Sequence, residues 1–445
     1  MISALERIAG IPKNPLGVER ERPVFLLVIF LMYIFAHQLK LNTRVDILGQ
    51  IRFEFILGLS LILISFYYIF TERTIKSRKA SYSKNTAIFY ILYLGLFVIF
   101  SFDRSLSWSV YMDRVLTFSL YGLFIVVFVR SPRSLMFFIL VYLLACLRLG
   151  YEGFHGWITG SMVWQNQGIM RLHGTTSVLL HPNSFSGFAV GLLPFIYYLF
   201  KPSTKYVRIM LVGLLIFSVI IIIYTGSRTG YVATILFVMY LFRNSRNKIK
   251  YGVALFLVAI ISIPFIPDQY IDRFSTIFTQ EEIEGQSMDK RKEIIKDAVE
   301  VFKMHPMGVG VGAFPIARDH YFGRKQDTHN LYLEVLTNSG FIGLGIFLIL
   351  VISIYRLNQH TLKSCLSLRN DGPIALKGED LIKMEAVVKA VNGYLVVRLI
   401  LGLFGMDMYE IYWWFILGIS IACANYISFC YSQSNFSNKN VLKLD

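Results

Sequence analysis

A histidine lies where a polar segment of the chain meets a long apolar one, in Asp327-Thr328-His329-Asn330. The change in polarity predicts that a helix starts here, with Thr328 or Asp327 capping its free backbone N–H groups. In the first turn of that helix, His329 would lie at the positive end of the helix dipole, which disfavours the imidazolium form. His329 is therefore a candidate proton acceptor, although the same residues also suit a polar cap at a membrane boundary.

Another histidine has a similar setting in the segment His181-Pro182-Asn183-Ser184, which precedes a second apolar run. Because a helix is expected to begin there as well, His181 is a rival for the role of base. Asn183 and Asn330 are further candidates for contact with a ligand bound by the histidines.

Two arginines could bind an anionic group. Arg228 lies in the segment 224–230, Tyr-Thr-Gly-Ser-Arg-Thr-Gly, between two apolar runs. Its glycine and hydroxyl neighbours, Ser227 among them, would let a polyanion reach both backbone and guanidinium. The alternative is an arginine that snorkels at the membrane interface. Arg291 is either a second anion ligand or one solvated charge among several on a basic helix.

The segment 164–174 is rich in aromatic and amide side chains, contains Arg171 and lacks acidic residues. Tryptophan faces and amide groups suit sugars, but the same composition is typical of the aromatic belt at a membrane interface. Further charged residues lie within or beside apolar runs, where they should be paired or line a cavity. They are Asp113, Arg114, Arg398, Asp407 and Glu410.

The composition indicates an integral membrane protein. Of 445 residues, 55% are hydrophobic and only 16% are charged, whereas soluble domains carry about 25% charged residues. The four cysteines have no ligand-like spacing, and we find no Asp-x-Asp, His-Glu-x-x-His or phosphate-binding glycine loop. We therefore expect no metal site and no cofactor, and ATP-driven transport and metal-dependent nucleotide-sugar transfer lose support.

Apolar runs long enough to cross a bilayer predict an all-α polytopic fold with about twelve transmembrane helices. The chain divides into an N-terminal bundle of about nine spans (1–267), a long loop (268–328) and a C-terminal bundle of about three spans (329–445). The runs lie near residues 24–39, 53–70, 86–102, 112–129, 134–149, 183–200, 207–224, 229–242, 250–267, 329–355, 386–405 and 410–430.

The net charge of +16 is concentrated in alternate connecting loops and in both termini. Because basic loops stay on the cytoplasmic side, we expect these loops and both termini to be cytoplasmic. Topology then explains most of the positive charge, and nucleic-acid binding is excluded. Three segments fall on the opposite face, namely 150–182, 225–229 and 268–328, and His329 emerges beside the last of them.

The long loop 268–328 contains an amphipathic helix and a glycine-rich turn. Residues 288–304 carry apolar side chains at helical spacing with basic ones between them, a pattern suited to lying on the membrane surface. The turn follows at 305–312, with glycine at alternate positions from 308.

The motifs, taken in order over roughly residues 180–350, resemble the O-antigen ligase and polymerase family. They are Thr-Gly-Ser-Arg-Thr-Gly at 225–230, Arg291 ahead of His-Pro-x-Gly-x-Gly-x-Gly-x-Phe at 305–314, and His-Asn-x-x-Leu at 329–333 followed by Gly-Phe-Ile-Gly-Leu at 340–344. The resemblance implies a GT-C-type glycosyltransferase of the bacterial inner membrane. Such enzymes take a glycan from undecaprenyl pyrophosphate on the periplasmic face and need no metal.

The resemblance also implies roles for single residues. His329 would be the base that activates an acceptor hydroxyl, and Arg228 and Arg291 would hold the pyrophosphate. Many family members have Ser-Gly-Arg ahead of the glycine turn, where this chain has Met-Asp-Lys-Arg at 288–291, so Lys290 and Lys292 compete with Arg291. Further contacts with the substrate are expected from Asn330, Arg171, Asn183 and Ser227.

Three functions fit these motifs. The first is a ligase that moves a finished glycan onto a lipid, glycan or protein acceptor, and the second is a polymerase that joins lipid-linked repeat units. The third is a polytopic transporter or flippase, which should show related halves with broken spans near the midplane. The polar motifs gather on one face instead, which favours an enzyme.

The topology can be tested with single cysteines in a variant that lacks the four native ones. We expect Gln286→Cys to react with a membrane-impermeant thiol reagent in intact cells and Lys377→Cys to react only after the cells are opened. Reaction at position 377 but not at 286 would contradict the orientation and every external site that depends on it.

Overall fold

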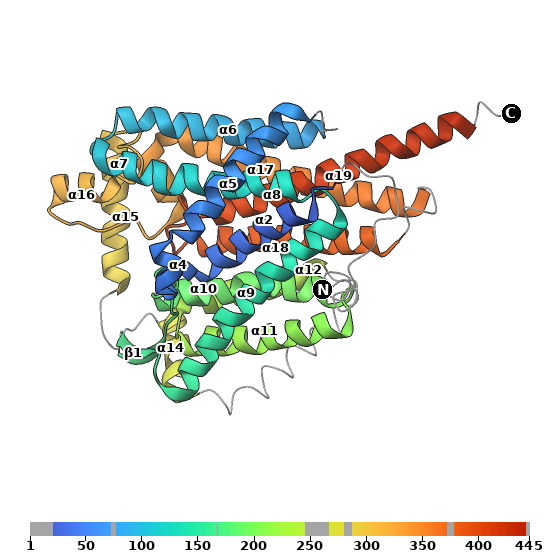
Figure 1. The fold of residues 1–445 in the computed structure, drawn as a ribbon. Helices are drawn as coiled ribbons and strands as arrows, with labels where there is room; N and C mark the ends of the chain where they lie inside the picture. The colour runs from blue at the N-terminus through green and yellow to red at the C-terminus, as the bar shows by residue number, and fades with distance from the viewer. Residues whose placement is uncertain are drawn as a thin grey trace.

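The computed structural model describes residues 21–72, 77–166, 168–244, 267–279, 287–371 and 378–441. Within these ranges the protein is all-helical apart from one two-stranded sheet (Figure 1). Eight helical segments of this described part are long and apolar enough to cross a membrane. The chain is therefore an all-α protein of polytopic membrane type, as its composition predicts. Each apolar run named above is largely helical except 250–267, which falls outside the described residues but for its last one. The total of about twelve spans and the three-part division stay predictions.

The elements follow one another in three groups. The first is α2 (Val24–Leu39), α3 (Leu41–Arg44), α4 (Asp46–Gln50), α5 (Phe53–Thr71), α6 (Arg78–Ile99), α7 (Arg104–Val110), η1 (Tyr111–Leu116, π-helical), α8 (Thr117–Phe128) and α9 (Pro132–Thr159). The second is β1 (Val163–Asn166), β2 (Ile169–Leu172), α10 (Pro182–Phe200), α11 (Lys205–Tyr224) and α12 (Arg228–Asn244). The third is α14 (Asp268–Thr279), α15 (Ser287–Met304), α16 (Phe314–Phe322), α17 (Leu331–Asp371), α18 (Glu379–Leu401) and α19 (Tyr412–Val441).

Helices α10, α18 and α19 form the centre of the bundle. Helix α10 packs against α18, and α19 packs against α8 and α17. In the apolar 18-residue stretch of α19, 89% of the residues are buried within the protein, whereas in that of α5 only 17% are buried. The exposed apolar face of α5 therefore suits lipid contact. Figure 1 shows α15, α16 and the sheet at one end of the bundle, where α10 also begins.

The sheet was not expected from the sequence. Strands β1 and β2 pair antiparallel, with Trp164 opposite Arg171, within the segment interpreted above as an aromatic and amide-rich loop. Ile169 and Leu172 are buried, so the hairpin packs its apolar side chains onto the bundle. The Trp164 ring stacks on His173, with ring centroids 4.6 Å apart.

The glycine-rich turn is docked onto a break in α17. At Gly340 the backbone has φ 69° and ψ −175°, a conformation essentially restricted to glycine. The break leaves helical carbonyls free to accept from the turn: Val309 N–H donates to Thr337 O at 2.9 Å, and Gly310 N–H donates to Asn338 O at 3.0 Å. A Cβ at Gly308 would lie only 2.6 Å from Gly340 N. The two backbones therefore fit together only with glycine at both positions.

Helix α17 contains a matched pair of glycines for testing this junction. A Cβ at Gly340 would lie 2.4 Å from the Met307 backbone, whereas one at Gly345 meets nothing within 4 Å. We expect Gly340→Ala to lower the stability by at least about 2 kcal/mol, because alanine cannot adopt this backbone conformation without strain. Gly345→Ala should be neutral or slightly stabilising. Apparent melting temperatures of the purified variants in detergent measure the difference, and equal values would show that the junction is unimportant.

Candidate functional site

A cavity of about 590 Å³ lies where several helices begin, a volume within the range typical of ligand pockets. Its lining includes Asn183 and Ser184 from the first turn of α10, Thr229 from the first turn of α12, and His329 just ahead of α17. Each helix start presents free N–H groups and the positive end of a dipole. The cavity is therefore suited to an anion before any side-chain charge is considered.

His329 lies outside the helix that it was expected to begin. Helix α17 starts at Leu331, and the Asn330 side chain caps it by accepting from Tyr332 N–H and Leu333 N–H, both at 3.0 Å. The prediction that Thr328 or Asp327 is the cap was wrong, because the Asn330 amide oxygen reaches the second and third N–H groups of the helix. His329 itself has φ 49°, a left-handed conformation that is uncommon outside glycine and that clusters at functional sites.

The imidazole of His329 has an acceptor nitrogen directed at a polar neighbour. The Gln326 amide Nε2 lies 3.0 Å from His329 Nε2, and with the amide in this orientation its nitrogen donates and the histidine nitrogen accepts. Burial lowers the pKa of His329, and the nearby Arg291 and Arg318 guanidinium groups lower it further. The ring is therefore neutral near pH 7 and carries its proton on Nδ1. No sequence signal pointed to Gln326.

His181 has the opposite tautomer. Its Nδ1 accepts from Asn183 N–H at 3.1 Å, so the proton of the neutral ring must lie on Nε2. Burial, Arg171, His329 and Arg291 lower the pKa of His181, in that order of effect. Both histidines line the same cavity. The residues that appeared to be rivals in the sequence are thus a hydrogen-bond acceptor and a hydrogen-bond donor.

Arg171 holds the hairpin in place and does not line the cavity. Its side chain is 1% exposed, and it donates from Nε to Thr225 O and from Nη2 to Asn183 Oδ1, both at 2.7 Å. It therefore connects β2 to the start of α10 and to the end of α11. Asn183 lines the cavity in addition to accepting this bond.

Ser227 and Asn330 also bond within the protein. Ser227 is fully buried, and its Oγ accepts from Gly230 N–H at 3.2 Å at the start of α12. The Asn330 side chain donates from Nδ2 to Leu403 O at 3.0 Å, which ties α17 to the loop between α18 and α19. Arg228 is the half-buried first residue of α12, and its neighbour Thr229 lines the cavity. Arg228 itself does not line the cavity.

Helix α15 brings Arg291 and Lys290 to the cavity, whereas Lys292 does not line it. The position of the helix depends on a buried ion pair in which Arg318 Nε donates to Asp297 Oδ2 at 2.9 Å, with both side chains at most 4% exposed. Arg324 also pairs with Asp297, at 3.2 Å.

The apolar face of α15 lies against protein. Ile294, Ala298 and Val301 are each at most 1% exposed, and the last two form a small core with Phe314 of α16. The expectation that this face lies on the membrane surface was wrong for these three residues, whereas Ile295 of the same predicted face is 45% exposed. Helical spacing specifies an apolar face without specifying what covers it.

Four of the five charges that lie within or beside the apolar runs form ion pairs, whereas Asp113 accepts a hydrogen bond from Ser109 Oγ at 2.9 Å. Arg398 lies 3.7 Å from Asp407 and its guanidinium carbon is 3.4 Å from the centre of the Tyr412 ring, while Arg114 bonds Glu410 at 2.5 Å. Arg398, Asp407 and Tyr412 line the cavity. Within the described part of the chain, no group of three or more His, Cys, Asp or Glu side chains is placed to hold a metal ion.

Comparison with known proteins agrees with the resemblance drawn from the motifs. Residues 213–348 match the family model described as O-Antigen ligase. The matched region runs from α11 into α17 and includes Arg228, Arg291 and His329. No curated protein matches the chain.

The anchoring of α15 can be tested through Asp297. We expect Asp297→Asn to leave Arg318 buried without its carboxylate, at a cost of about 3 kcal/mol, so that amide hydrogen exchange in α15 becomes roughly 100-fold faster. Glu300→Gln on the same helix is the control, because Glu300 forms only an exposed pair with Lys303. Equal exchange in the two variants would show that the buried pair does not hold α15.

Proposed function

We propose, from the assignment of residues 213–348 to the O-antigen ligase family, that this protein transfers a glycan from undecaprenyl pyrophosphate to an acceptor hydroxyl. The family match and the eight candidate spans support a membrane glycosyltransferase of O-antigen ligase type. We place the reaction on the periplasmic face of the bacterial inner membrane. The observation that carries the proposal is one cavity that combines an acceptor nitrogen on His329 with Arg291 and several helix starts.

The diphosphate of the donor would bind at the helix starts. Arg291 lines the cavity beside Thr229 and Ser184, so charge, hydroxyl groups and free N–H groups are available together. Arg228, the first residue of α12, does not line the cavity, but it adjoins the lining residue Thr229 and is the second arginine that we propose for the diphosphate. Guanidinium groups can form paired bonds to phosphate oxygens and offset charge without a divalent ion. We therefore propose a reaction that needs neither metal nor cofactor.

His329 would act as the general base. The acceptor hydroxyl would take the place of the Gln326 amide at His329 Nε2 and give its proton to that nitrogen. The oxygen would then form a bond to the anomeric carbon while the bond from that carbon to the diphosphate breaks, and the electron pair would leave on the diphosphate. A base positioned in this way contributes about 10²–10⁴-fold to the rate. His181, with its proton on Nε2, would donate a hydrogen bond to the leaving diphosphate.

The tertiary positions of the remaining candidates suggest indirect roles. We propose that Arg171, Ser227 and Asn330 position the starts of α10, α12 and α17 and that Asn183 contacts the substrate. These roles follow from the buried hydrogen bonds of the first three and from the exposure of Asn183 to the cavity.

A transfer assay with purified protein in nanodiscs tests the function. The lipid-linked glycan donor is supplied alone or with a separate lipid, glycan or protein acceptor, in excess chelator. One product that requires the second acceptor identifies a ligase, and a ladder of products from donor alone identifies a polymerase. Absence of any glycan transfer, with movement of lipid-linked glycan across the bilayer instead, would favour a flippase and contradict the proposal.

The same assay tests His329. Asparagine tolerates the left-handed backbone at this position but cannot act as a base, so His329→Asn should lower kcat by about 10²–10⁴-fold and leave donor binding unchanged. His181→Asn preserves the helix cap and should be milder.

The pH profile of kcat/KM provides a second check. Because the pKa of His329 lies below its ordinary value of 6.5, activity should be full above pH 6.5 and fall as the pH drops through the lowered pKa. Near-normal turnover of His329→Asn, or an unchanged acid limb in its residual activity, would show that another group is the base.

A further inference from the structure

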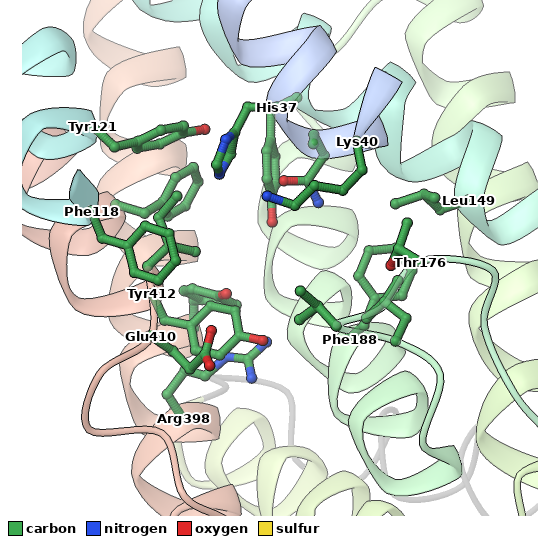
Figure 2. Close-up of a pocket in the computed structure, with 17 residues that line it drawn as sticks. His37, Lys40, Phe118, Tyr121, Leu149, Thr176, Phe188, Arg398, Glu410 and Tyr412 are labelled. Carbon is green, nitrogen blue, oxygen red and sulfur yellow. The ribbon is translucent and has the colours of Figure 1, made fainter. Parts of the chain in front are cut away.

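A second cavity lies beside the first and is not used in the proposed reaction. It has a volume of about 80 Å³ and is lined by side chains of α8, α9, α10, α18 and α19, the end of α2 and the segment that precedes α10. Arg398 and Tyr412 line both cavities, so a ligand in one lies next to a ligand in the other. Figure 2 shows the side chains that surround this second cavity.

The walls of the second cavity are aromatic. Phe118 and Tyr121 come from α8, Phe188 comes from α10, and Tyr412 comes from α19. Aromatic faces bind the C–H faces of sugar rings, and tyrosine adds a hydroxyl for hydrogen bonding. An aliphatic ligand would not need the polar groups that accompany these rings.

Those polar groups offer both donors and an acceptor. In Figure 2 the Lys40 side chain extends into the cavity, with Glu410 and Arg398 on the opposite side. Among the described residues, no hydrogen bond or ion pair is formed by the Lys40 ammonium. Glu410 uses Oε1 to bond Arg114 at 2.5 Å, which leaves Oε2 as an acceptor for a ligand hydroxyl.

Arg398 gives the clearest indication that a ligand binds in this cavity. It is 4% exposed, and its Nε has no hydrogen-bond partner in the described part of the chain. The guanidinium is held between the Tyr412 ring, 3.4 Å from its centre, and the Gly187 carbonyl, which accepts from Nη2 at 3.4 Å. A buried, unsatisfied N–H is unfavourable unless a ligand or water supplies the acceptor.

The size of the cavity fits one sugar ring. A water molecule needs roughly 10–15 Å³ of such volume, so about 80 Å³ holds about six waters, comparable to a single pyranose ring. A longer glycan would have to continue into the larger cavity. The combination of aromatic walls, cationic donors, a free carboxylate oxygen and this volume is what a sugar residue requires.

We propose that the second cavity is a sugar-binding subsite that holds one ring next to the diphosphate site. The inference rests on the proposed function, because the ring belongs either to the acceptor or to the donor glycan. Lys40 and Glu410 hydrogen-bond the ring hydroxyls, and Phe118 contacts its apolar face. The subsite thereby positions one substrate relative to His329.

Two variants and a matched control test this subsite. Lys40 has φ 53°, so Lys40→Gly removes the ammonium at a position where glycine is unstrained. Arg52→Gly removes another cation from a left-handed position, with φ 50°, that lines neither cavity. Phe118→Leu removes the ring while keeping an apolar side chain.

Photolabelling reports on binding independently of catalysis. Diazirine derivatives of glucose, galactose and N-acetylglucosamine are irradiated with the wild-type protein and the variants in nanodiscs, and the labelled peptides are mapped. We expect at least one probe to label the segments around Lys40, Phe118 or Glu410. The label should be lost in Lys40→Gly and Phe118→Leu and kept in Arg52→Gly. No labelling there by any probe, or equal labelling of all variants, would overturn the subsite.

Kinetics then identify which sugar occupies the subsite. We expect Lys40→Gly to raise one KM by about tenfold, the loss of one charge-assisted hydrogen bond, with kcat and melting temperature unchanged. A raised acceptor KM assigns the ring to the acceptor, a raised donor KM assigns it to the donor, and two unchanged KM values overturn the inference while leaving the proposed function intact. If the wild-type protein transfers no glycan, the proposed function fails and the photolabelling result alone decides the subsite.

Discussion

The break of α17 at Gly340 is the constraint on which the arrangement of the site depends. A continuous helix would use its own carbonyls internally, whereas this break offers Thr337 O and Asn338 O to the turn that contains Val309 and Gly310. The turn connects α15 to α16, so its position influences where Arg291 lies. The short helical segment ahead of the break begins at Leu331, two residues after His329. One backbone junction therefore relates the residue proposed as base to the residue proposed to hold the diphosphate.

Electrostatics explain why it matters that His329 and Arg291 line the same cavity. The starts of α10, α12 and α17 and the Arg291 side chain make one cavity positive. Burial lowers the pKa of His329, and the Arg291 charge lowers it further. A cavity with this positive charge, proposed above to bind the diphosphate, thus also favours a neutral histidine that can accept a proton. The buried pair of Arg318 and Asp297 contributes indirectly, by holding α15 against α16.

Charged side chains inside an apolar bundle need partners or a ligand. Arg114 and Glu410 satisfy each other, and Arg398 is partly satisfied by Asp407, Gly187 and the Tyr412 ring. The remaining hydrogen-bonding capacity of Arg398 and Glu410 faces the smaller cavity. The two cavities therefore differ in chemistry: the larger is cationic and suits a diphosphate, and the smaller is aromatic with both donors and an acceptor.

The sequence by itself determined the helical class of polytopic membrane type, most helix positions and the resemblance to the O-antigen ligase family that residues 213–348 support, because apolar periodicity and short motifs depend on residues close together in the chain. It also selected His329 and Arg291, whose roles stay predictions.

Only the tertiary structure decided which nitrogen of each histidine accepts, since that depends on the local bonds made by Asn183 and Gln326. The tertiary structure also decided that Arg171 is buried and donates to Thr225 O, 54 residues away in the sequence. It covered the apolar face of α15 with α16, and it formed the smaller cavity from Lys40 and Glu410, which lie at opposite ends of the sequence. Such contacts are set by the packing of distant helices, and no local pattern specifies them.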